Sequence, residues 1–153
     1  MNIKKPSVAL PLNKIEWITD SQFETVCYNF AKEHLEFKQP IPAFATRSTG
    51  VLESCLSAPF QTFDGVDLYP SFLDKLSILV YLLIKNHPFI NGNKRIALVT
   101  MLVILEINKL WLDVPWAMPY KLVRYIARSD GRQKDRTIAK IKRFLKKHIV
   151  HLG

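Results

Sequence analysis

The sequence predicts a mostly α-helical protein of one domain, with a single small β-hairpin. Three observations predict this class: the length of 153 residues, the 48% of hydrophobic residues, and apolar positions that repeat at helical spacing in most segments. One hydrophobic core organises roughly 100–200 residues, so the length excludes a multidomain protein. We expect residues 1–18 to form an N-terminal arm and residues 19–150 to form the folded domain.

The first predicted helix begins at Asp20 and Ser21, which form a helix start signal, and ends near His34. Its core-facing stripe is expected to consist of Phe23, Val26, Cys27, Phe30 and Ala31. Upstream of it, the arm is expected to dock through Ile15, Trp17 and Ile18. A loop containing Pro40 and Pro42 follows. A second, short helix is then predicted over residues 51–56, where Pro59 stops it.

Residues 60–69 predict the hairpin, because aromatic and β-branched residues flank an Asp64-Gly65 turn signal. The pattern from Ser71 to Asn86 is helical, and Pro88 forces the residue before it out of helical geometry. Further helices are predicted over residues 93–110, 120–128 and 135–149. Because the first of these three is apolar nearly all round, we expect it to be the buried central helix.

Charge and cysteine usage limit the classes of partner and of site. Twenty-two Lys and Arg against 13 Asp and Glu give a net charge of +9, which favours acidic partners. Cys27 and Cys55 lack C-x-x-C spacing and are expected to be buried free thiols. The longest apolar run is shorter than the ~20 residues of a membrane span, and no secretory signal is visible. We therefore expect a soluble, cytoplasmic protein.

The segment that carries chemistry is HPFINGNKR, residues 87–95, between the two most hydrophobic predicted helices. The amides of Gly92, Asn93 and Lys94 should lie at a helix N-terminus, which is a ready site for a phosphate. Lys94 and Arg95 add positive charge beside them. The imidazole of His87 can accept a proton from an attacking hydroxyl near neutral pH. A base beside a phosphate site predicts group transfer.

This string resembles the signature of the Fic/Doc (Fido) family, His-Pro-Phe-x-Asp/Glu-Gly-Asn-Gly/Lys-Arg, and matches seven of its eight defined positions. The resemblance covers roughly residues 40–145. It implies the all-α Fido helical fold with a small β-hairpin flap. In that fold the motif bridges two core helices, and the flap, residues 60–69 here, positions the target peptide by strand addition.

Lys94 favours the Doc-like branch, since members that transfer AMP carry Gly at that position. The resemblance then implies phosphorylation of a protein hydroxyl with ATP and Mg²⁺, and elongation factor Tu is the family's known substrate. His87 is the implied general base, and Phe89 anchors the loop in the core. The implied catalytic residues are His87, Lys94 and Arg95, and the implied phosphate-binding residues are Gly92, Asn93, Lys94 and Arg95. Transfer of AMP or another nucleotide remains the alternative reaction.

Asn91 departs from the family pattern, because it replaces the Asp or Glu that binds Mg²⁺. Its carbonyl oxygen still ligates a hard cation but brings no negative charge. Three outcomes remain open. The nucleotide phosphates hold the metal with Asn91 as a neutral helper, or activity is reduced, or the protein is a binding scaffold.

No inhibitory helix of the family type is visible, since the nearest string, residues 49–54, ends in the wrong residue. Restraint is therefore expected from a separate acidic antitoxin chain of the Phd type, which the positive net charge suits. The last predicted helix places Arg136, Lys140, Arg143 and Lys147 on one face, and a solvated basic face is the default expectation. Nucleic acid is not expected as the main partner, because no zinc finger or RNP string is present.

Overall fold

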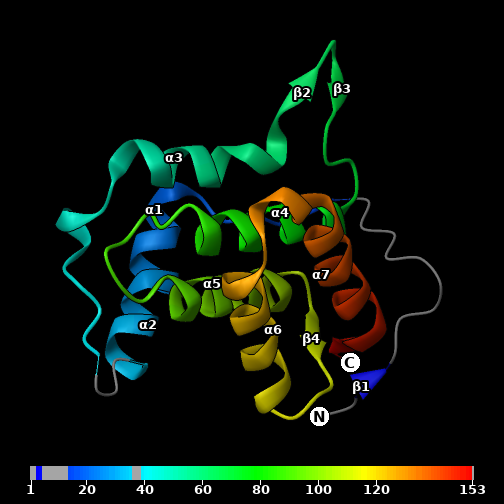
Figure 1. Ribbon diagram of the computed structural model, residues 1–153. Helices are drawn as coiled ribbons and strands as arrows, with labels where there is room; N and C mark the ends of the chain where they lie inside the picture. Colours follow the sequence, from blue (N-terminus) through cyan, green and yellow to red (C-terminus); the bar gives the residue numbers. More distant parts are fainter. Residues whose placement is uncertain (1–2, 5–13, 36–38, 153) are drawn as a thin grey trace.

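Two long helices, α4 (Phe72–Lys85) and α5 (Asn93–Ile107), pack against each other at the centre of the molecule (Figure 1). The computed structural model describes residues 3–4, 14–35 and 39–152. The remaining helices surround this pair, and they are α1 (Asp20–Gln22), α2 (Asn29–His34), α3 (Thr49–Ser57), α6 (Ala117–Arg128) and α7 (Lys134–His148). The prediction of a mostly helical fold is confirmed.

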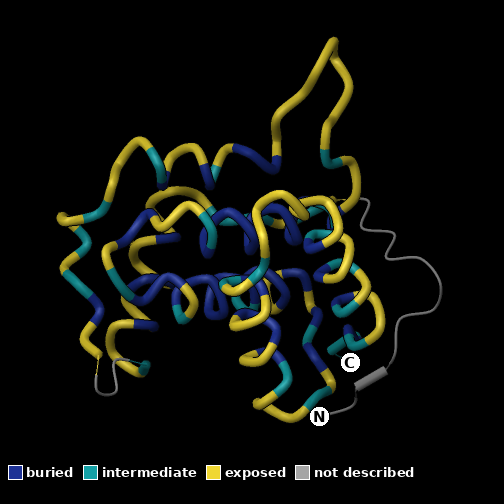
Figure 2. Tube along the Cα trace, viewed as in Figure 1, coloured by how far each residue is buried: buried dark blue, intermediate teal, exposed yellow. Residues whose placement is uncertain are grey.

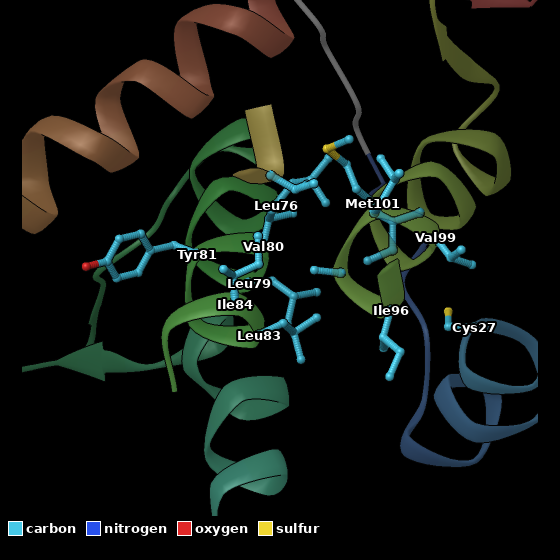
Figure 3. Close-up of a cluster of buried hydrophobic side chains, with 14 of the residues drawn as sticks. Cys27, Leu76, Leu79, Val80, Tyr81, Leu83, Ile84, Ile96, Val99 and Met101 are labelled. Atoms are coloured by element: carbon cyan, nitrogen blue, oxygen red, sulfur yellow. The ribbon is translucent and has the colours of Figure 1, made fainter. Parts of the chain in front are cut away.

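The core lies between α4 and α5, and Figure 3 shows side chains of the two helices turned toward each other. Leu76 and Leu83 of α4 and Ile96 and Met101 of α5 are each at most 1% exposed. Burying one such side chain contributes about 1.5–3 kcal/mol. The prediction that the helix beginning at Asn93 is the buried centre is confirmed.

The first helical segment runs from Asp20 to His34, as predicted, but residues Phe23–Tyr28 are π-helical. A π-turn adds a residue per turn and rotates the buried face. Phe23, Cys27, Tyr28 and Ala31 are therefore buried, whereas Val26 and Phe30 are 44% and 50% exposed. The prediction that Val26 and Phe30 face the core is wrong.

The predicted hairpin forms from β2 (Thr62–Phe63) and β3 (Val66–Asp67), and it projects from the helical body (Figures 1 and 2). Both turn residues, Asp64 and Gly65, have positive φ, as the two central residues of a type I′ hairpin turn do. The buried ammonium of Lys75 donates to the carbonyl oxygens of Pro59 and Tyr69, and thus fastens both ends of the hairpin segment to α4.

Helix α4 begins at a capping box, in which Ser71 and Asp74 exchange hydrogen bonds. The carboxylate of Asp74 also pairs with Lys142 of α7 at 2.6 Å. Burial alone raises the pKa of Asp74, but hydrogen bonds from Lys142 and Ser71 and the charge of Lys142 outweigh it and lower that pKa. This contact therefore stabilises the junction of α4 and α7 in the ionised form.

A three-stranded antiparallel sheet, which the sequence did not predict, has the order β1-β5-β4. It consists of β1 (Ile3–Lys4), β4 (Leu110–Leu112) and β5 (Ile149–Leu152). Helix α5 ends at Ile107 rather than at 110, because Asn108 caps it and Lys109 has φ +60°. Leu110 then pairs with His151. Ile149, the expected last residue of the final helix, opens β5.

The expected arm, residues 1–18, lies partly outside the described residues. Within its described part, Ile15, Trp17 and Ile18 pack against the core, as predicted, and the Trp17 ring meets Phe60 edge-on at 5.3 Å. Helix α6 begins at Ala117, three residues before the predicted start, because Pro119 is tolerated in a first helical turn. In the described ranges, no helix is long and apolar enough to cross a bilayer.

Candidate functional site

His87 follows directly on the end of α4 and adopts a left-handed backbone conformation, with φ +49°. Helices commonly end on such a residue, and glycine is the usual choice because other residues are strained there. The conformation turns the chain sharply away from α4 before Pro88 and leaves the side chain of His87 exposed. A strained residue at a helix end is a feature of functional sites.

Phe89 anchors the loop after His87, as expected. Its side chain is 2% exposed, and its ring stacks on Tyr28 at 5.6 Å and on Phe23 at 6.3 Å. The carbonyl oxygen of Pro88 accepts a hydrogen bond from the amide of Ser48, just before α3. The loop is therefore fixed by the π-helical segment and by Ser48, the residue before α3.

The side chain of Asn93 ties the loop to the first turn of α5. Its Oδ1 accepts from the amide of Phe89 at 3.0 Å, and its Nδ2 donates to the carbonyl of Phe89 at 2.8 Å. The same Nδ2 lies 3.4 Å from Nδ1 of His87. Asn93 is 8% exposed, so its two hydrogen bonds with Phe89 are protected from water. The contacts of Asn93 hold the imidazole against the N-terminus of α5.

Gly92 caps α5 in the left-handed conformation, with φ +84°. A Cβ atom there would lie 2.9 Å from Cγ1 of Ile41, so both backbone conformation and space require glycine. The amides of Asn93 and Lys94, in the first turn of α5, have no acceptor among the residues that the structure describes. Free amides at the positive end of a helix dipole favour a phosphate.

The side chains of Lys94 and Arg95 have different surroundings. Lys94 is exposed beside the free amides. Arg95 is half-buried, and its Nη1 donates to the carbonyls of Leu35 at 2.7 Å and of Gln39 at 2.6 Å. Arg95 thus fastens the chain that follows α2 onto α5. A role in clamping phosphate stays a prediction, and it requires the guanidinium to release one of these carbonyls.

Asn91 is a weak metal ligand in this arrangement. Its Oδ1 already accepts from the amide of Gly92 at 2.8 Å, and its Nδ2 lies 3.4 Å from the carbonyl oxygen of Pro40. The described residues contain no group of three or more His, Cys, Asp or Glu placed to hold a metal. Magnesium sites usually combine one or two carboxylates with nucleotide phosphates. The site therefore fits a phosphate well, and it fits Mg²⁺ only if the nucleotide supplies most ligands.

An apolar groove of about 720 Å³ borders this site at Arg95. Its lining residues come from the first helical segment, α5 and α6 (Figure 1 shows where these helices lie). Its apolar lining includes Val26, Phe30, Leu98, Leu102, Trp116 and Tyr120. Its charged lining consists of Arg95, Lys121, Arg124 and Glu106. Sequence periodicity missed this groove because Val26 and Phe30 matched the pattern of core positions.

Cys27 and Cys55 are buried free thiols, as expected. Burial raises the pKa of both thiols to about 11, so neither forms an appreciable thiolate near neutral pH. The hairpin is present but lies at the opposite end of α4 from His87. Fourteen residues of helix separate the two ends by about 21 Å. Strand addition beside His87 therefore stays a prediction.

The structure thus brings His87, Gly92, Asn93 and Lys94 together in one loop, with Asn91 beside them and Arg95 turned toward α2. Sequence reasoning gave Asn93 a role only through its amide and missed its side chain. The available signal was an Asn placed four residues after Phe89, at the spacing of one helical turn.

Comparisons with known proteins identify the family of this sequence. A model of the Fic/DOC family matches residues 11–105. Over 62 residues, 40% of this chain, the sequence is 39% identical to Toxin Doc of Mycolicibacterium smegmatis. The matched region spans about half the length of that relative, 48% of it. No solved structure matches the chain.

Proposed function

The chain belongs to the Fic/DOC family, whose members are transferases, and from this premise we propose that it is a toxin-type protein phosphotransferase. It transfers the γ-phosphoryl group of ATP to a Ser or Thr hydroxyl of a translation factor such as elongation factor Tu. The observation that carries the proposal is the contact of His87 with Asn93, which holds a base at the N-terminus of a helix with free amides.

His87 acts as the general base. Its Nδ1 lies beside Nδ2 of Asn93, which can only donate a hydrogen bond. Nε2 takes the proton of the target hydroxyl when the neutral ring carries its own proton on Nδ1, the tautomer in which Asn93 contacts the ring without a hydrogen bond to it. The hydroxyl oxygen then bonds to the γ-phosphorus, the bond from that phosphorus to the bridging oxygen breaks, and ADP leaves. Phe89 and Asn93 fix the loop, so the base is positioned before the substrates bind.

The amides of Asn93 and Lys94 bind the oxygens of the transferred phosphoryl group. The exposed ammonium of Lys94 adds a full positive charge at the same place and offsets the charge that develops in the transition state. A side chain of that size fills the space that glycine leaves open in members that transfer AMP. Lys94 thereby favours presentation of the γ-phosphate over the α-phosphate.

Mg²⁺, when bound, neutralises charge on the nucleotide phosphates. Asn91 would offer it one neutral oxygen, Oδ1, which here accepts from the amide of Gly92. We therefore expect that substituting Asn91 changes the affinity for Mg²⁺ little, and that removing the nucleotide lowers this affinity strongly.

We further propose that a separate acidic antitoxin of the Phd type restrains the protein, which acts in the cytosol. The net charge of +9 suits an acidic partner. The groove bordered by Arg95, Lys121 and Arg124 offers the apolar surface with a basic rim that an acidic amphipathic segment needs. Expression of the chain alone should stop growth, and harmless expression would contradict this part of the proposal.

A second candidate is a catalytically silent binding protein, which the neutral Asn91 favours. The deciding experiment incubates the purified protein with elongation factor Tu, ATP and Mg²⁺, and reads the intact mass of the target. His87→Ala is the test variant, and His151→Ala in β5 is the matched control that removes a remote imidazole. We expect a gain of one phosphate with the parent and the control, and none with His87→Ala.

Other changes in the mass of the target decide between the alternative functions. An added AMP would contradict the role given to Lys94. If the target stays unchanged, Asn91→Asp restores the family carboxylate. Transfer by that variant would show that Asn91 limits activity through weak binding of Mg²⁺. Continued inactivity toward this target would refute elongation factor Tu as the substrate.

A further inference from the structure

The positive charge of the chain is concentrated at one end of the sequence. Residues 117–152, which hold α6, α7 and β5, contain 11 Lys or Arg against two Asp or Glu, so their net charge of +9 equals that of the whole chain. The remaining residues are balanced, with 11 of each sign. Such asymmetry marks a surface for a polyanion.

Four of these cations form a stripe along α7. Arg136, Lys140, Arg143 and Lys147 recur every three or four residues, and all are exposed. Eleven residues of helix separate the first from the last, so the stripe is about 16 Å long. Figure 2 shows exposed chain along the outer side of α7. Lys140 also lies over the ring of Tyr125 at 3.7 Å, which joins the stripe to α6.

The stripe is not neutralised within the protein. Two other cations of this region are paired, Lys142 with Asp74 and Arg132 with Asp130. The four stripe residues form no ion pair with a carboxylate in the described part of the chain. Like charges at this spacing repel one another, so a bound polyanion would relieve a destabilising interaction.

The composition of the stripe favours a nucleic acid over a protein partner. Protein interfaces have an apolar centre and are depleted in Lys, whereas nucleic-acid interfaces are strongly basic and direct most contacts to phosphates. The aromatic contact of the stripe is the ring of Tyr125, which lies under the ammonium of Lys140. The apolar groove contacts α6 through Tyr120, Lys121 and Arg124, and Tyr125 is not among the residues that line it.

We propose that the α7 stripe, together with Tyr125, binds the phosphate backbone of a single-stranded RNA. This binding does not depend on His87 or on the proposed transfer reaction. It has little sequence preference, because phosphate contacts carry no base information, and any base can stack on the ring of Tyr125 once Lys140 turns from that ring to a phosphate. The surface holds the protein near RNA while the His87 loop remains open.

The test is fluorescence anisotropy of a labelled oligouridine of about 20 nucleotides, without ATP or a protein substrate. Four phosphate contacts on a single strand give a slope of about −3 for log K against log salt, hence about 50-fold weaker binding at 200 mM than at 50 mM salt. Substitution of all four stripe residues by Gln should lower affinity at least about tenfold and bring the slope near zero. Gln keeps helix propensity, and circular dichroism checks the fold.

A matched pair of double variants tests whether the RNA binds at the stripe. Lys140→Gln with Arg143→Gln removes two charges from the stripe, and Lys121→Gln with Arg124→Gln removes two from the groove side of α6. We expect the first pair to lose at least about three times more affinity than the second. Equal losses, absence of binding, or displacement of the RNA by polyglutamate of equal charge would overturn the proposal, and the last would identify an acidic protein segment as the partner.

Discussion

Truncating the side chain of Asn93 should lower both the free energy of unfolding and the rate of phosphate transfer. Asn93→Ala removes two hydrogen bonds to the backbone of Phe89, at 3.0 and 2.8 Å. Each contributes about 0.5–1.5 kcal/mol, and leaving the buried amide of Phe89 without a partner costs about 1–3 kcal/mol. We expect the free energy of unfolding to fall by about 2–3 kcal/mol. Urea denaturation followed by circular dichroism measures it.

The same variant should lose transfer activity beyond its loss of stability, because His87 is no longer held at the N-terminus of α5. A displacement of about 1 Å costs on the order of 100-fold in rate. Asn108→Ala is the matched control at the other end of α5. Its side chain is 7% exposed and exchanges hydrogen bonds with both backbone groups of Glu16, at 2.9 Å each.

Asn108→Ala should therefore cost a similar free energy of unfolding and leave the transfer rate of the folded fraction unchanged. The reasoning is refuted if the two variants, assayed under conditions where both are folded, transfer phosphate equally well. It is also refuted if Asn93→Ala unfolds at the same urea concentration as the parent protein.

Three further predictions concern backbone strain and charge. His87→Gly should be about 1 kcal/mol more stable than His87→Ala in thermal unfolding, since glycine relieves the strain at φ +49°, although both variants lose transfer. Gly92→Ala should cost about 2–4 kcal/mol in urea, and Gly65→Ala, with positive φ but open space, only about 1–2 kcal/mol. Asp74→Asn should cost about 1 kcal/mol at neutral pH by losing the charge paired with Lys142. Because the folded pKa of Asp74 is lowered, this difference should be complete above pH ~4 and vanish as the pH falls through that lowered value.

Helix positions were predictable where the sequence carries both periodicity and a start or stop signal. Ser71 and Pro88 bracket α4, and Asp64-Gly65 defines the hairpin turn. The sheet was not predictable, because its strands are two to four residues long and pair residues 3–4 with 149–152. Segments that short contain too few alternating positions to reveal a strand.

The sequence motif names the residues of the candidate site but does not predict how they are arranged. A motif names His87, Asn91 and Arg95, yet it does not say that Arg95 donates to two carbonyls or that Asn91 accepts from the next amide. The Arg95 contacts depend on Leu35 and Gln39, which lie far away in the sequence. The groove escaped detection for a related reason, since the π-helical turn exposes Phe30 without disturbing its helical spacing.

The central claim is that His87 directs the γ-phosphate of ATP to a protein hydroxyl. The most direct measurement runs parallel reactions with ATP labelled in the γ-phosphate and ATP labelled in the α-phosphate, and follows the label on elongation factor Tu. We predict label from the γ-position only, abolished in His87→Ala. Label from the α-position, or γ-label that persists in His87→Ala, would contradict the account.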